Sequence, residues 1–95
     1  MGAILLRNNT SKMILRIVIP ARDMNRVKKF VDDLKNSGIN PVVSKRQKIF
    51  ENRPDLDVIE LIYILYLTPV EEKDIRKQLS KMLSGTIGFF LLYGI

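Results

Sequence analysis

The stretch that decides the fold is DVIELIYILYL, residues 57–67. Apart from Asp57 and Glu60, it contains only Val, Ile, Leu and Tyr. A short run this rich in β-branched and aromatic residues is typical of a strand that is buried on both faces. Because side chains alternate along a strand, one face carries only large apolar residues, which we expect to lie beneath helices. These residues are Ile59, Leu61, Tyr63, Leu65 and Leu67.

Three more strands and two helices are predicted around this stretch. We expect the strands at residues 13–19, 41–50 and 86–93, where apolar and β-branched residues gather. Pro20 ends the first of them, because proline cannot donate a hydrogen bond to the sheet. Asp23 is the predicted N-cap of a helix that runs to about residue 37. A second helix begins at the capping box TPVE of residues 68–71 and stops before Gly85.

The order strand, helix, strand, strand, helix, strand resembles the ferredoxin-like fold over residues 13–93. The resemblance implies an α+β (βαββαβ) sandwich, in which two helices cover one face of a four-stranded antiparallel sheet. Its strands lie in the order fourth, first, third, second (4-1-3-2), which places residues 57–67 in the interior of the sheet. We expect residues 1–12 to form an N-terminal arm or a peripheral strand, ahead of a single domain at residues 13–95.

The chain of 95 residues contains no Cys and no His. This excludes thiolate chemistry, imidazole acid–base catalysis and most zinc sites. Acylphosphatases share the predicted topology, but their glycine-rich loop is replaced here by PARD at residues 20–23. Small CRISPR-associated nucleases are similar in size and order, but their metal-binding Asp is replaced here by Ile19 and Pro20. We therefore expect a protein that is not an enzyme, with no catalytic residue, metal or cofactor.

The face of the sheet away from the helices is predicted to be largely apolar and to form the interface of a homodimer. The residues expected there are Ile14, Arg16, Val18, Val58, Glu60, Ile62, Ile64 and Tyr66. The last strand adds either Ile87, Phe89, Leu91 and Tyr93 or Phe90 and Leu92. A bare apolar face of this size exceeds what a soluble monomer exposes, so either a second copy or the N-terminal arm is expected to cover it.

Arg16 and Glu60 are the only charged residues predicted within that apolar face. We expect them to pair across neighbouring strands, because a charge in a partly dry interface is costly unless it is neutralised. One such pair could also fix the register of a dimer. The competing interpretation is that Glu60 marks a face that stays in contact with water.

Positive charge is concentrated in the strand at residues 41–50 and the turn that follows it. The chain has 16 Lys and Arg against 10 Asp and Glu, which gives a net charge of +6. Lys45, Arg46, Lys48 and Arg53 are the candidate contacts to a DNA or RNA backbone. Alternation puts Lys45 and Arg46 on opposite faces of this strand. The competing interpretation is that edge lysines only prevent strand-to-strand aggregation.

Two functions remain open at this point. The first is a small, basic homodimer that binds a nucleic-acid backbone through residues 45–53. The second is a regulatory or scaffolding dimer that binds a protein or a small ligand, as ACT-type sensor domains of this topology do by pairing their sheets. Residues 1–12 lack the pattern of a signal peptide, and the longest uncharged run, residues 82–95, is too short to span a membrane. We expect a cytoplasmic protein; the composition is compatible with a thermophilic or viral source.

Overall fold

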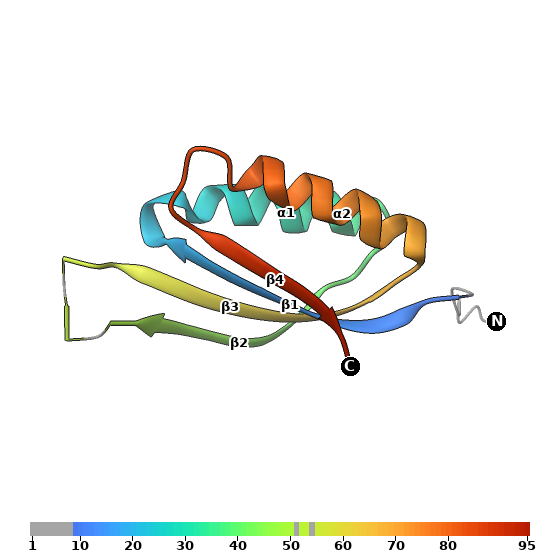
Figure 1. The fold of residues 1–95 in the computed structure, drawn as a ribbon, viewed down its shortest axis with the longest axis horizontal. Coiled ribbons are helices and arrows are strands. Elements are labelled where there is room, and N and C mark those ends of the chain that lie inside the picture. The colour runs from blue at the N-terminus through green and yellow to red at the C-terminus, as the bar shows by residue number, and fades with distance from the viewer. Residues whose placement is uncertain (1–8, 51, 54) are drawn as a thin grey trace.

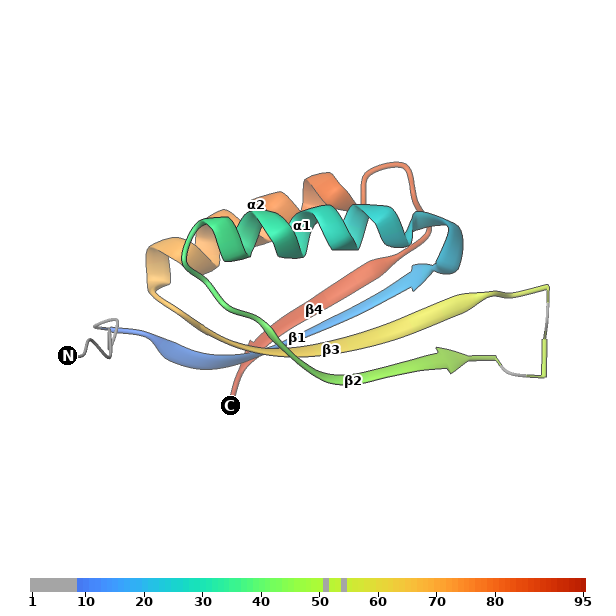
Figure 2. The ribbon, with the colours of Figure 1, turned by 180° about the vertical axis from the view of Figure 1, so that it is seen from behind.

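The computed structural model describes residues 9–50, 52–53 and 55–95. Its elements in chain order are β1 (Ser11–Pro20), a 3-10 turn η1 (Ala21–Asp23), α1 (Met24–Asn36), β2 (Val42–Ile49), β3 (Val58–Leu67), α2 (Pro69–Met82) and β4 (Phe89–Gly94). The sheet has the order β2-β3-β1-β4, and every neighbouring pair is antiparallel. Both helices lie on one face of the sheet (Figure 1), as the view from behind also shows (Figure 2). The predicted ferredoxin-like sandwich and its strand order are confirmed.

The core lies between the helices and the two central strands, β1 and β3. Burial alternates along β3 as predicted: Ile59, Leu61, Tyr63, Leu65 and Leu67 are buried, and the residues between them are more exposed. The helices close this core with side chains at helical spacing. These are Val27, Phe30 and Leu34 from α1 and Ile75 and Leu79 from α2.

The capping box at the start of α2 is confirmed. The Thr68 hydroxyl accepts a hydrogen bond from the Glu71 amide at 3.2 Å, and the Glu71 carboxylate accepts one from the Thr68 amide at 2.9 Å. Two backbone amides that a helix start leaves without intrahelical partners are satisfied in this way. α2 therefore begins at Pro69, directly after the Thr68 cap that the sequence predicted.

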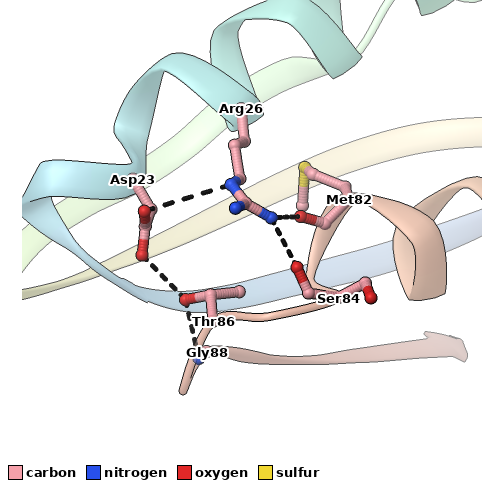
Figure 3. A network of polar contacts seen from close by, with 6 residues as sticks. All are labelled: Asp23, Arg26, Met82, Ser84, Thr86 and Gly88. Carbon is pink, nitrogen blue, oxygen red and sulfur yellow. Dashed lines mark hydrogen bonds and ion pairs between the residues drawn. The ribbon is translucent and has the colours of Figure 1, made fainter.

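α1 begins directly after Asp23, as predicted, but its first turn is not capped in the expected way. Asp23 occupies the N-cap position, but its side chain makes no capping hydrogen bond. Its carboxylate instead accepts a hydrogen bond from the Thr86 hydroxyl at 2.8 Å and lies 3.9 Å from Arg26 Nε (Figure 3). Arg26 donates to the carbonyl oxygens of Met82 at 2.9 Å and Ser84 at 2.7 Å. The capping role predicted for Asp23 is wrong, because this residue helps to hold the α2–β4 loop against α1.

Two strand boundaries also differ from the sequence-based ranges. β1 begins at Ser11 rather than at residue 13, because Ser11 and Lys12 continue the pairing with β3, opposite Leu67 and Tyr66. β4 begins at Phe89 rather than at residue 86, because the Thr86 hydroxyl is engaged with Asp23 and the Gly88 amide. Residues 1–8 of the predicted arm lie outside the described residues.

Candidate functional site

The face of the sheet opposite the helices is here called the open face, and neither helix of the described residues lies over it (Figure 1). Directly opposed residues of antiparallel strands lie on the same face. Val18 is opposite Phe89, Arg16 opposite Leu91 and Ile14 opposite Tyr93, which puts the odd-numbered residues of β4 on this face. The eight predicted interface residues all lie on it, and Lys12, Lys45, Gln47, Ile49, Phe89, Leu91 and Tyr93 join them.

The choice that the sequence left open for the last strand is therefore settled. Phe90 and Leu92 turn toward the helices, where Leu92 is buried and Phe90 packs against the core. Ile87 precedes β4 and is 75% exposed. Alternation could not decide between the two faces, because both sets of side chains are large and apolar.

Several large apolar side chains of the open face are exposed to solvent. Tyr66 is 53% exposed, Phe89 51%, Leu91 47% and Tyr93 43%. At about 200 Å² per aromatic side chain, Tyr66, Phe89 and Tyr93 leave on the order of 300 Å² of aromatic surface exposed. The half-buried Ile14, Ile62 and Ile64 extend this surface across β1 and β3. An exposed apolar area on the order of 300 Å² is at the lower end of the range for the largest patch on a typical monomer, and such patches often have a function.

A small polar cluster lies within this apolar surface. Arg16 Nε is 3.4 Å from Glu60 Oε2, so the predicted Arg16–Glu60 pair is confirmed. Gln47 Nε2 donates a hydrogen bond of 2.6 Å to the other carboxylate oxygen of Glu60. The Glu60 side chain is only 14% exposed and that of Arg16 is 38% exposed. The two charges thus neutralise each other on a face that is partly dry even in the single chain.

The basic residues predicted to bind nucleic acid are divided between the two faces. Lys45 is opposite Ile62 and belongs to the open face, whereas Arg46 and Lys48 are opposite Leu61 and Ile59 on the helix side. The pairing shifts register between Val43 and Lys45, but alternation resumes after it. Their closeness in sequence therefore does not make these cations one surface.

Two of the four basic residues are also partnered by acids. Lys48 Nζ lies 3.5 Å from Asp57, and Arg53 donates to both carboxylate oxygens of Asp55 at 3.0 and 3.2 Å. The Arg53 hydrogen bonds lower the pKa of Asp55 below its ordinary value. Only Lys45 and Arg46 have no acidic group within 4 Å among the residues that the structure describes.

The comparisons with known proteins establish the fold. No family model matches the chain, and no curated protein matches it. The C-terminal domain of the MgtC protein from Mycobacterium tuberculosis has a TM-score of 0.67 at 10% identity, over 93% of this chain and 90% of that one. An unknown protein from Galdieria sulphuraria has a TM-score of 0.75 at 13% identity, over 98% of this chain and 54% of that one. A nitrogen regulatory PII-like protein from Thiomonas intermedia has a TM-score of 0.53 at 12% identity, over 88% and 89%.

The described residues show neither a metal-binding cluster nor a membrane-spanning helix. They contain no cluster of three His, Cys, Asp or Glu residues that could hold a metal ion. Neither helix among them is both long and apolar enough to cross a membrane. That the protein lacks catalytic activity stays a prediction.

Proposed function

We propose that this chain is a non-enzymatic, cytoplasmic domain that forms a homodimer by packing two open faces together. The exposed aromatic and aliphatic side chains of β3 and β4 carry this proposal. A stable interface takes about 800 Å² from each partner. A four-stranded face that already leaves about 300 Å² of aromatic surface in water can contribute a large part of that area.

The charges of the open face support a second copy as the partner. Arg16 and Glu60 cancel at its centre, so two such faces can meet without burying an unpaired charge. The remaining cations, Lys12 and Lys45, lie on the two strands that flank β3, opposite Tyr66 and Ile62 respectively. Their long side chains can reach solvent while their apolar stems stay on the sheet.

A regulatory or scaffolding role is the function that this assembly supports best. The chain has neither Cys nor His, which removes thiolate nucleophiles and the commonest general base. A dimer that pairs its sheets creates surfaces that neither copy has alone, and ACT-type domains of the same topology use such surfaces for ligands. The lack of Cys is also compatible with the reducing conditions of the cytoplasm.

Sedimentation of matched variants tests the dimer. Leu91→Glu adds a charge to the middle of the open face, whereas Val70→Glu adds the same charge to an apolar residue of α2 that is 71% exposed. We expect the wild type and Val70→Glu to sediment as dimers in the micromolar range and Leu91→Glu as a folded monomer by circular dichroism. A wild type that stays monomeric at these concentrations would contradict the proposal, as would dissociation by Val70→Glu.

Binding of a nucleic-acid backbone by the β2–β3 hairpin is a second candidate function. One observation favours it: the hairpin extends past the end of both helices (Figure 1), and Lys45 and Arg46 have no acidic partner among the described residues. Against it, residues 45–57 hold four Lys or Arg and three Asp or Glu, which leaves a net charge of only +1.

Retardation of random-sequence duplex DNA and RNA at increasing salt tests this candidate. Replacing both Lys45 and Arg46 by Gln should reduce the slope of log affinity against log salt by about 2. Replacing Lys73 and Lys77, two exposed lysines of α2, is the matched control and should leave the slope unchanged. No retardation of either duplex at about 50 mM salt would exclude this function.

A further inference from the structure

A cleft of about 410 Å³ lies on the helix side of the sheet, between α1 and the edge formed by β2 and β3. It exists because β2 extends beyond the cover of the helices: most of its side chains are exposed on both faces of the sheet. The buried side chains of Val27, Leu61 and Tyr63 line the cleft from below. Val43 of β2, which is 56% exposed, forms its outer apolar wall.

The rim of this cleft is predominantly positive. Lys28 and Lys35, about two helical turns apart, lie on it from α1, and Arg46 lies on it from β2. Asp32 is the single acid among its lining residues. None of these four side chains has an oppositely charged group within 4 Å in the part of the chain that the structure describes. The rim thus has three cations for one acid, and the excess charge is not consumed by internal pairs.

Tyr63 supplies a hydrogen-bond donor beneath that rim. Its side chain is 6% exposed, and its hydroxyl makes no hydrogen bond to another described residue. Burial raises the pKa of Tyr63, and the nearby Arg46 guanidinium opposes part of that rise. The phenol therefore stays protonated at neutral pH, where it can donate to an anion that enters the cleft.

We propose that this cleft binds a small amphipathic carboxylate, with its aliphatic tail over Val43 and Leu61 and its head group at Arg46 and the Tyr63 hydroxyl. Small-molecule sites typically have about 300–1,000 Å³, mostly apolar walls and a few polar groups that orient the ligand. Arginine and carboxylate form charge-assisted hydrogen bonds of the strongest class in proteins. The cleft lies on the opposite side of the sheet from the open face, so this proposal does not depend on the dimer.

The size and charge of the cleft favour this ligand class over a phosphate. A free phosphate would leave the apolar wall of Val43 and the buried floor uncovered, and it would bring two charges toward Asp32. A single carboxylate on an aliphatic chain uses the apolar surface and matches the modest excess of positive charge. Burying each methylene of such a chain strengthens binding about fourfold, a gain that an ion without a tail cannot make.

Amide chemical-shift titration with decanoate, and with 1-decanol as its neutral counterpart, tests the proposal. We expect saturable shifts at Val43, Arg46 and Tyr63 with decanoate, and binding of decanol weaker by about tenfold or more. Arg46→Gln should weaken decanoate binding by a similar factor. Lys48→Gln, which removes the same charge from the same face of β2 two residues away, should leave the affinity unchanged.

Three results would overturn the proposal. Decanoate shifts confined to open-face residues such as Ile62 and Leu91 would place binding on the other side of the sheet. Equal affinity for decanoate and decanol would show that no cation recognises the head group. An equal loss in Arg46→Gln and Lys48→Gln would show a general effect of net charge rather than a contact in this cleft.

Discussion

The Arg16–Glu60 pair allows a quantitative test of the open face. An exposed ion pair contributes about 0.2–1 kcal/mol, whereas removing one partner of a fully buried pair costs about 3–5 kcal/mol. Glu60 is mostly buried at 14% exposure, but Arg16 is 38% exposed, so water screens the interaction from one side. For the single chain we therefore expect a coupling energy of about 1 kcal/mol between the two side chains.

A double-mutant cycle measures this coupling by urea unfolding at neutral pH. Arg16→Met keeps an unbranched apolar stem on the sheet, and Glu60→Gln keeps an oxygen that can accept the hydrogen bond from Gln47. The cycle is run in the wild type and in a Tyr66→Glu background, which we expect to be monomeric. Tyr66 lies opposite Lys12, six residues along β3 from Glu60. By contrast, Leu91 lies directly opposite Arg16, and a Glu there would itself pair with the arginine. If a second copy covers the face, exclusion of water should raise the coupling in the wild type to about 2–3 kcal/mol.

Two outcomes would refute this reasoning. A coupling within about 0.5 kcal/mol of zero in both backgrounds would show that the 3.4 Å contact contributes nothing to stability. Equal couplings in the two backgrounds would show that no second copy removes water from the pair, which contradicts the proposed dimer.

Three single changes test other parts of the molecule. Gly88→Ala should destabilise the fold by about 2–3 kcal/mol or more in thermal unfolding, because a Cβ there would lie 2.7 Å from the Val18 carbonyl oxygen. Thr68→Ala should lower the free energy of unfolding in urea by about 1 kcal/mol through loss of the helix cap. Burial raises the pKa of Tyr63, so above pH 10 the unfolded chain loses this proton first and stability falls with pH. Tyr63→Phe should flatten that fall; a slope equal to that of the wild type would contradict the assignment.

Local patterns in the sequence were sufficient where neighbouring residues decide the structure. The alternation of residues 58–67 predicted both faces of β3, because successive side chains of a strand point to opposite faces of the sheet. The capping box predicted the start of α2, because both hydrogen bonds join residues three apart. Together with the predicted order of strands and helices, these two patterns were enough to predict the topology of the sheet.

Contacts between distant segments could not be predicted in this way. Asp23 looked like a helix cap in its local sequence, but its carboxylate binds Thr86, which lies 63 residues further along the chain. The orientation of β4 depends on its register with β1, since its own side chains are apolar on both faces. The cleft beside α1 combines residues of three elements, none of which carries a recognisable motif.

The edge strand β2 shows why a cluster of charges in a sequence is ambiguous. The helices do not cover β2, so charged side chains cost little there on either face. Protection against aggregation needs only that cations stand at the edge, and all of Lys45, Arg46 and Lys48 meet that condition. A binding surface needs cations that share a face and lack acidic partners. Lys45 and Arg46 lack acidic partners among the described residues, but they lie on opposite faces of the sheet. On the surface of the protein these two residues therefore belong to different regions: Lys45 lies at the margin of the open face, and Arg46 lies at the rim of the cleft.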